Sequence, residues 1–120
     1  MGVDLARIER FRRFVVDDSP VLERIFCSSE RDYSLARRDP AQALAARFAA
    51  KEAFFKALGT GMRDGLSWQQ VCVQRDELGC PSLELSGRAV EMMAERGAQR
   101  VWLSYSHDGD YAVATVILEA

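Results

Sequence analysis

Several features that would place a protein in a special class are missing from this sequence. No apolar run approaches the ~20 residues that a membrane-spanning helix needs, and the start, MGVDLARIER, lacks the apolar core of a signal peptide. The net charge of -2 provides no long-range attraction for nucleic acid. We therefore expect a cytoplasmic protein that binds neither membranes nor nucleic acid.

The cysteine content is also low. Cys27, Cys72 and Cys80 form no CxxC motif and no Cys/His cluster. Their odd number argues against a complete disulfide framework. We expect all three to be reduced thiols.

The composition that is present is that of an ordinary globular protein. Hydrophobic residues make up 48% and charged residues 28%, a balance typical of neither disordered nor fibrous proteins. A chain of 120 residues is long enough to bury one core and too short for two independent ones. The sequence therefore predicts a single domain over residues 1–120.

Helical patterns dominate the first half of the chain. Apolar residues recur at helical spacing over residues 8–15, with arginines between them, which indicates an amphipathic helix with a basic face. Residues 21–26 suggest another helical turn or two before Ser28, a candidate N-cap of the helix that follows. A further helix is expected over residues 87–96.

Strand patterns dominate the second half and predict a mainly antiparallel sheet. The expected strands are residues 71–74, 82–85, 101–106 and 111–118, in addition to a short strand at residues 1–6. Asp108-Gly109 lies between the last two strands and is a strong hairpin signal for a type I′ turn.

The segment 41–58, AQALAARFAAKEAFFKAL, is apolar almost all the way round, which is typical of a helix buried inside a protein. At about 100° per residue, Glu52 shares a face with apolar residues, and Lys56 lies one turn further along that face. An ionised carboxylate in such surroundings is costly unless it is paired or bound to a metal. Glu52 is thus either an ion-pair partner of Lys56 or a metal ligand.

Arg47 and Lys51 form a second pair at helical spacing, and both carry a positive charge. Two adjacent cations favour an anionic ligand. The alternative is a solvated basic stripe on the helix surface. The spacing alone does not decide between the two interpretations.

Residues 47–61, RFAAKEAFFKALGTG, resemble the signature of the bacterial holo-acyl-carrier-protein synthases, the short 4′-phosphopantetheinyl transferases. Three further pieces agree in order and position, namely Gly2-Val3-Asp4, Gly79-Cys80-Pro81 and the run LSYSHD at residues 103–108. The resemblance spans essentially the whole chain. The family often has a lysine at the position of Cys80, so no contact of that lysine is carried over.

The resemblance implies transfer of 4′-phosphopantetheine from coenzyme A to a serine of apo-acyl carrier protein, with release of adenosine 3′,5′-bisphosphate, in fatty acid biosynthesis. Asp4 and Glu52 would bind Mg²⁺ beside the coenzyme A diphosphate. Lys56 would stabilise or protonate the leaving group. The general base for the serine proton is either Glu52 or a water bound to the metal.

The resemblance also assigns residues to the two substrates. The implied coenzyme A ligands are Arg47, Lys51, Ser106 and His107. The implied carrier-binding residues lie on or beside the first helix and are Arg7, Arg10, Arg13 and Phe14, which without the resemblance would be a solvated face. Asp108 either favours the turn or adds a third carboxylate near the metal.

The implied fold is α+β, the 4′-phosphopantetheinyl transferase fold, with the long buried helix packed on a mainly antiparallel sheet. The short class works as a homotrimer with active sites between subunits. Two rival functions are a catalytically silent carrier-binding module and the same chemistry on a polyketide or peptide-synthetase carrier. Retention of both Asp4 and Glu52 argues against the first, and the sequence does not separate the carriers.

Overall fold

The computed structural model describes residues 1–120, and the other elements are arranged around one long helix, α4 (Pro40–Leu58). Thirteen of its 19 residues are buried, and together they show no polar face. Pro40 lies in the first turn, where its missing N–H costs nothing, and Gly59 ends the helix with a positive φ of 81°. The predicted long buried helix is confirmed.

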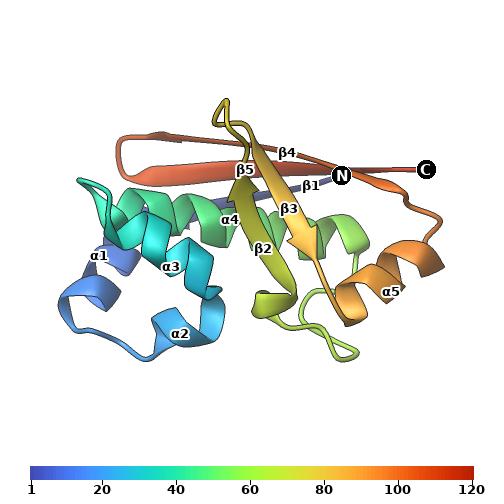
Figure 1. The fold of residues 1–120 in the computed structure, drawn as a ribbon, viewed down its shortest axis with the longest axis horizontal. Helices are drawn as coiled ribbons and strands as arrows, with labels where there is room; N and C mark the ends of the chain where they lie inside the picture. The colour runs from blue at the N-terminus through green and yellow to red at the C-terminus, as the bar shows by residue number, and fades with distance from the viewer.

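A three-stranded antiparallel sheet covers one side of α4, as Figure 1 shows. Its strands are β1 (Gly2–Arg7), β4 (Arg100–Asp108) and β5 (Tyr111–Glu119), in the order β1-β5-β4. The face toward α4 carries small residues, among them Gly2, Ala6 and Ala112, which let the helix backbone come close to the sheet. The mainly antiparallel sheet and the α+β class are confirmed.

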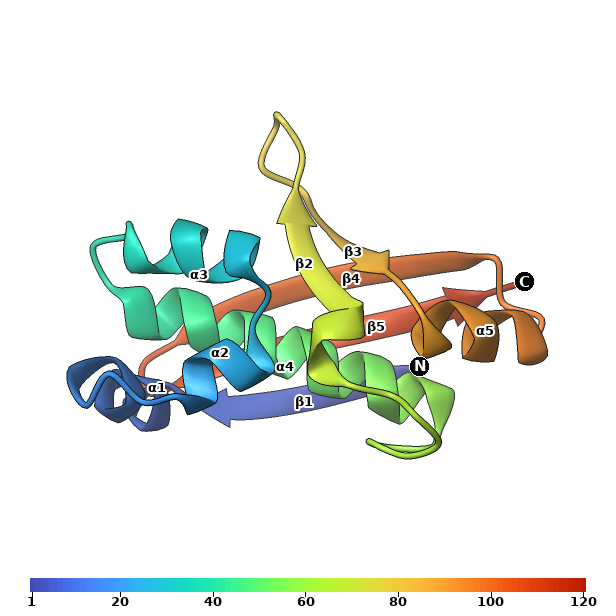
Figure 2. The same cartoon turned by 60° about the horizontal axis from the view of Figure 1, so that its bottom comes forward.

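The remaining elements cover the rest of α4 (Figure 2). They are the helices α1 (Ile8–Val16), α2 (Val21–Ile25), α3 (Ser28–Leu35) and α5 (Arg88–Glu95), the 3₁₀ turn η1 (Trp68–Gln70), and a hairpin of β2 (Val71–Arg75) and β3 (Pro81–Leu85). The hairpin is a separate two-stranded sheet. No helix combines the length and the apolarity that crossing a membrane requires.

The structure shifts two predicted features, the N-cap of α3 and the centre of the last hairpin turn, by one residue each. Cys27, not Ser28, is the N-cap of α3, because Glu30 then falls at the third helical position and its Oε1 accepts the Cys27 N–H at 2.9 Å. The β4–β5 turn has Gly109 and Asp110 at its centre, since Asp108 pairs with Tyr111. Of the two, only Gly109 has a positive φ, as in a type II′ rather than a type I′ turn.

The prediction that all three cysteines are reduced is wrong, because Cys27 and Cys72 form a disulfide. Their Cα atoms lie 6.1 Å apart, within the usual range for such a bond. The two residues are 45 positions apart in the chain, so their spacing gave no signal. The disulfide joins the start of α3 to β2, and Cys80 stays free and exposed.

Among the glycines, Gly2 leaves the least room for a side chain, because its backbone lies directly against that of α4. This close contact predicts a loss of stability on substitution. A Cβ added there would lie 2.0 Å from the Ala53 carbonyl oxygen and 2.6 Å from the Ala57 nitrogen, both backbone atoms of α4. Because helix backbone cannot move aside like a side chain, Gly2→Ala should lower the free energy of unfolding by about 2–3 kcal/mol. Urea unfolding measures the loss. The exposed Ser29→Ala serves as the control, and equal stability of the two variants would contradict the packing described.

Candidate active site

Asp4 lies on the face of β1 that turns toward α4, the same face as Gly2 and Ala6. Its Oδ1 is 2.8 Å from the Lys56 Nζ, and Lys56 also donates to the Val3 carbonyl at 3.3 Å. The Asp4 side chain is 14% exposed and that of Lys56 is 55% exposed. The structure thus brings together a predicted metal ligand and a predicted catalytic lysine, which are 52 positions apart in the chain.

Glu52 does not pair with Lys56, so the simple ion pair within the helix is not formed. Its Oε1 accepts a hydrogen bond from the Trp68 indole Nε1 at 3.1 Å. The Trp68 carbonyl in turn accepts from the Lys51 Nζ at 3.0 Å. Trp68 is a contact that sequence analysis missed, because it lies in η1, outside every motif, and only the folded chain brings it to α4.

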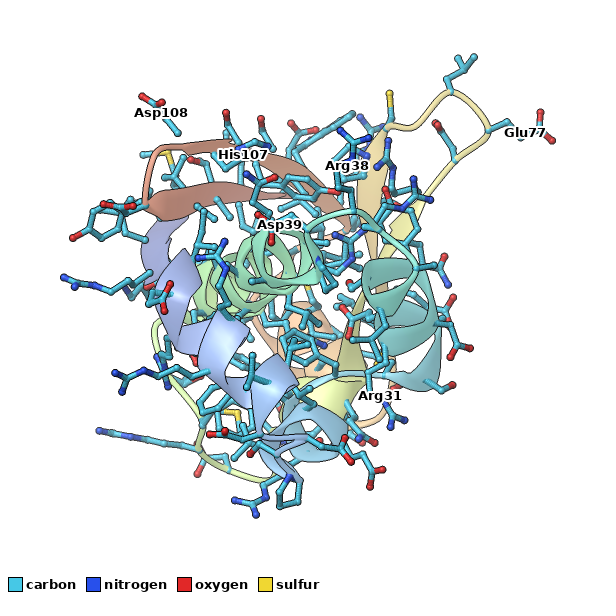
Figure 3. The ribbon with its side chains drawn as sticks, turned by 90° about the vertical axis from the view of Figure 1, so that its left-hand side faces the viewer. Arg31, Arg38, Asp39, Glu77, His107 and Asp108 are labelled. Atoms are coloured by element: carbon cyan, nitrogen blue, oxygen red, sulfur yellow. A yellow bond between two sulfur atoms is a disulfide. The ribbon has the colours of Figure 1, made fainter.

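Asp4 and Glu52 fit a hard divalent cation. Each carboxylate uses one oxygen in a protein hydrogen bond and keeps the other without a protein donor. Carboxylate oxygens are the ligands that Mg²⁺ prefers, and it usually takes one or two of them, together with water and substrate phosphate. Asp108 is exposed at the end of β4 and points outward in Figure 3.

A third carboxylate does not complete the set. The only group of three or more metal-binding atoms within 4.8 Å of one another is Cys27, Glu30 and Cys72. That group is occupied by protein bonds, because the two cysteines form the disulfide and Glu30 is fully paired. Within one copy of the chain, no geometry supports Asp108 as a third carboxylate near the metal. The other interpretation, that Asp108 favours the turn, is consistent with its position beside the β4–β5 turn.

Lys51 is fully buried and belongs to an internal ion pair. Its Nζ lies 2.7 Å from the Glu30 Oε1 and donates to the carbonyls of Trp68 and Val71. Glu30 also accepts the Val73 N–H at 2.8 Å. Burial lowers the pKa of the Lys51 ammonium below its ordinary value, and the Glu30 carboxylate opposes that shift.

These contacts change the interpretation of the Arg47–Lys51 pair. Arg47 is 3% exposed and Lys51 is 0% exposed, so the interpretation of this pair as a solvated basic stripe is wrong. The three partners of the Lys51 ammonium are all protein groups, which leaves it no free donor for a coenzyme A phosphate. Arg47, by contrast, reaches a cavity.

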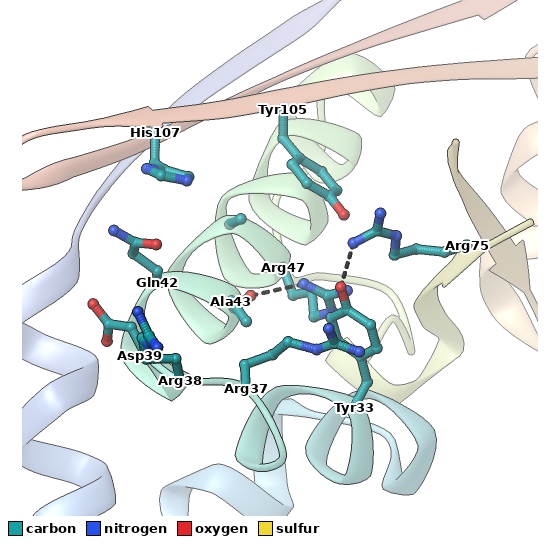
Figure 4. Close-up of a pocket in the computed structure, with 11 residues that line it drawn as sticks. Tyr33, Arg37, Arg38, Asp39, Gln42, Ala43, Arg47, Arg75, Tyr105 and His107 are labelled. Atoms are coloured by element: carbon teal, nitrogen blue, oxygen red, sulfur yellow. Dashed lines mark hydrogen bonds between the residues drawn. The ribbon is translucent and has the colours of Figure 1, made fainter. Parts of the chain in front are cut away.

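That cavity has a volume of about 540 Å³, and it is strongly basic (Figure 4). It is lined by Tyr33, Arg37, Arg38, Asp39, Gln42, Ala43, Ala46, Arg47, Arg75, Tyr105 and His107. Its one carboxylate, Asp39, pairs with Arg12 on α1 at 3.2 Å. Two of the implied coenzyme A ligands, Arg47 and His107, thus line the same cavity. Ser106, the residue before His107, lies on the opposite face of β4.

The predicted carrier-binding residues also converge. A groove of about 450 Å³ is lined by Arg7, Arg10, Arg13 and Phe14 together with Glu9. The Arg10 guanidinium lies 5.1 Å from the centre of the Phe48 ring, and Arg7 donates to the Tyr111 hydroxyl at 3.1 Å. The groove and the basic cavity are separate features of the surface.

The family model for the 4′-phosphopantetheinyl transferase superfamily matches residues 1–116. The chain belongs to this superfamily. It is 53% identical to a holo-[acyl-carrier-protein] synthase of Trichlorobacter lovleyi, over 100% of this chain and 96% of the relative. The corresponding synthase of Syntrophotalea carbinolica is also 53% identical, over 99% of this chain and 94% of the relative.

Solved structures of superfamily members share the fold. The holo-[acyl-carrier-protein] synthase of Neisseria meningitidis matches with a TM-score of 0.87 and 33% identity, covering 99% of this chain and 96% of that one. The synthase of Helicobacter pylori in complex with coenzyme A matches with a TM-score of 0.84 and 29% identity, covering 98% of each chain. The family and the enzyme class predicted from the sequence are confirmed.

The buried ion pair predicts that Lys51 contributes mainly to stability. Lys51→Met leaves the Glu30 carboxylate buried without its cation, which should cost about 3–5 kcal/mol of unfolding free energy. In a Glu30→Gln background the same change should cost much less, because no charge is left unpaired. Chemical unfolding of the four proteins measures this coupling.

An exposed ion pair provides the control for Lys51→Met. Arg100 and Glu119 lie 3.3 Å apart with side chains that are 66% and 49% exposed, so Arg100→Met should change stability by less than about 1 kcal/mol. A Lys51→Met protein of normal stability that binds coenzyme A poorly would instead restore the phosphate-binding interpretation.

Proposed function

We propose that the chain transfers the 4′-phosphopantetheine group of coenzyme A to a serine of an apo-acyl carrier protein and releases adenosine 3′,5′-bisphosphate. The observation that carries the proposal is the meeting of β1 and α4, which places Asp4 against Lys56 one helical turn beyond Glu52. In a member of this superfamily, two carboxylates and a lysine at one junction provide what phosphoryl transfer needs. Charge on the diphosphate is neutralised, and the leaving group is stabilised.

Asp4 and Glu52 would hold the Mg²⁺ ion. When bound, that ion supplies charge neutralisation for the diphosphate and polarises the phosphorus for attack. The Trp68 indole fixes the orientation of the Glu52 carboxylate by donating to one of its oxygens. Glu52 is also a candidate base for the serine proton, alongside a water in the same site.

Lys56 is suited to act on the leaving group. Its side chain is 55% exposed, so the ammonium can reach a substrate, and its contact with Asp4 holds it beside a proposed metal ligand. A cation there stabilises or protonates the phosphate oxygen that leaves with adenosine 3′,5′-bisphosphate. Such a contact strengthens as charge develops and therefore acts mainly in the transition state.

The basic cavity would bind the phosphates of coenzyme A, with Arg47 and His107 as the predicted ligands in its wall. Arg47 and Glu52 are five positions apart, so they point about 140° apart around α4. One copy of the chain thus carries the cavity and the proposed metal site on different faces of the same helix. A homotrimer with each site between two copies would bring both kinds of residue to one substrate.

The outer face of the three-stranded sheet supports assembly. It exposes large apolar side chains that no element of the chain covers, namely Val3, Leu5, Trp102 and Ile117. Ser106 lies on this same outer face, where a residue implied to contact the cofactor would reach it from a neighbouring copy. Apolar patches of this kind are typical of interfaces between proteins.

The acceptor is proposed to be an acidic carrier protein that docks on the groove of Arg7, Arg10, Arg13 and Phe14. The position of the chain in fatty acid biosynthesis and in the cytoplasm stays a prediction. A polyketide or peptide-synthetase carrier is an alternative acceptor for the same chemistry. Incubation with coenzyme A, Mg²⁺ and a panel of apo-carriers, followed by mass measurement of each carrier, identifies the acceptor, and no modified carrier at all would favour a silent binding module.

The metal assignment makes a prediction about transfer. Asp4→Asn and Glu52→Gln should each reduce the rate of carrier modification at least a hundredfold at limiting Mg²⁺, because each removes an anionic ligand from the proposed site. Both should keep the folded circular-dichroism spectrum. The matched control is Glu77→Gln, which changes an exposed carboxylate at the tip of the β2–β3 hairpin (Figure 3). Parental rates in the two site variants would exclude the metal assignment.

The carrier-binding groove makes a separate prediction. Arg10→Glu combined with Arg13→Glu should raise the KM for the carrier and flatten its dependence on salt, because exposed charges mainly steer encounter and are screened over ~8 Å at physiological ionic strength. Affinity for coenzyme A should not change. Arg100→Glu, an exposed charge reversal at the start of β4, is the control. If the double variant modifies the carrier at the parental rate across a salt series, the docking surface lies elsewhere.

A further inference from the structure

Three arginines of the basic cavity share one aromatic ring. The guanidinium carbons of Arg37, Arg47 and Arg75 lie 4.1, 4.3 and 5.3 Å from the centre of the Tyr33 ring. Arg75 also donates a hydrogen bond to the Tyr33 hydroxyl, drawn as a dashed line in Figure 4. The ring thus contacts side chains from three parts of the chain, which are the loop between α3 and α4, the middle of α4 and the end of β2.

This cluster contains no carboxylate to neutralise it. Like charges this close repel one another, and the negative face of an aromatic ring offsets only a part of that repulsion. Arg47 is 3% exposed, its Nη1 donates to the Ala43 carbonyl at 3.0 Å, and its buried Nε has no partner. A buried guanidinium with an open donor, beside two other cations, is arranged for an anionic ligand that enters the cavity.

We propose that Tyr33 is a positioning residue that holds Arg37, Arg47 and Arg75 in the arrangement that binds the phosphates of coenzyme A. This inference rests on the proposed function, which supplies the ligand. Arg37 and Arg75 are exposed and have long side chains, so each would otherwise lose much rotational freedom when it contacts a phosphate. Stacking on one fixed ring orders both arginines before the ligand arrives. Less rotational freedom is then lost on binding, so the ligand binds more tightly than it would to freely rotating arginines.

Tyr33 itself is well placed to stay fixed. It lies on α3, whose first turn is anchored by the Glu30 carboxylate and by the disulfide between Cys27 and Cys72. The same disulfide is attached to β2, the strand that ends at Arg75. The ring and the most distant of its three arginines are therefore tied to one another through the backbone as well as through the hydroxyl.

Binding of adenosine 3′,5′-bisphosphate, measured by calorimetry without carrier or Mg²⁺, tests the proposal. Tyr33→Leu should weaken binding roughly tenfold or more, because it removes the ring under all three guanidinium groups. Tyr33→Phe keeps the ring and loses only the hydroxyl, so it should stay within about threefold of the parent. A Phe variant that binds as weakly as the Leu variant would overturn the stacking role.

Kinetics and a matched tyrosine separate positioning from general damage. With coenzyme A as substrate, Tyr33→Leu should raise KM and leave kcat within about twofold, since the ring does not touch the reacting atoms. Tyr111→Leu removes a different ring, one that is exposed and holds an arginine, Arg7, outside the cavity, and it should not alter binding of the bisphosphate. Bisphosphate binding by Tyr33→Leu at the parental affinity would overturn the proposal.

A double-variant cycle shows whether Tyr33 acts through its arginines. Arg75→Ala should weaken bisphosphate binding less in the Tyr33→Leu background than in the parent, because the leucine variant no longer holds Arg75 in place. Independent, additive losses would show that the ring does not act through Arg75. If the parental protein itself binds neither coenzyme A nor the bisphosphate, the proposed function fails, which is a different outcome from a failure confined to Tyr33.

Discussion

The burial of α4 on all sides is the constraint on which the other elements depend. A helix without a polar face is stable only if neighbouring elements cover its whole circumference. The three-stranded sheet covers one side, and the short helices and the β2–β3 hairpin cover the rest. Small residues make this cover tight, since Gly2 on β1 lies directly against the α4 backbone at Ala53. That close contact also brings Asp4 to the helix.

A buried helix that carries charges must find partners for them inside the protein. Lys51 pairs with Glu30, Glu52 accepts from Trp68, and Arg47 lies against the Tyr33 ring. The Lys51 and Glu52 contacts are linked, because the carbonyl and the indole of the same tryptophan serve the two neighbouring residues of α4. The groups that stabilise the core and the groups that orient the proposed site are therefore next to one another, and a change in one reaches the other through a single residue, Trp68.

Much of this architecture could be predicted from local sequence. The period and apolarity of residues 41–58 gave the long helix, and the motif at residues 47–61 gave the family. Contacts between distant segments could not be predicted in this way. The Glu30 that neutralises Lys51, the Trp68 that holds Glu52 and the Cys27–Cys72 bond each join positions 16 to 45 residues apart. Spacing rules describe neighbours on one helix or strand, so they suggested a Glu52–Lys56 pair where the fold supplies Asp4 instead.

The use of both faces of one unbroken helix limits how this protein can change in length. One residue inserted between Arg47 and Glu52 would turn everything after it by about 100° and move it about 1.5 Å along the axis. The cavity and the carboxylate junction would then no longer face their own partners, even if every side chain were retained. The turn at residues 17–20, the loop at residues 60–67 and the hairpin tip at residues 76–80 lie outside the helices and the paired strands. Insertions and deletions are expected to be tolerated in those segments, whereas α4 is expected to keep its 19 residues.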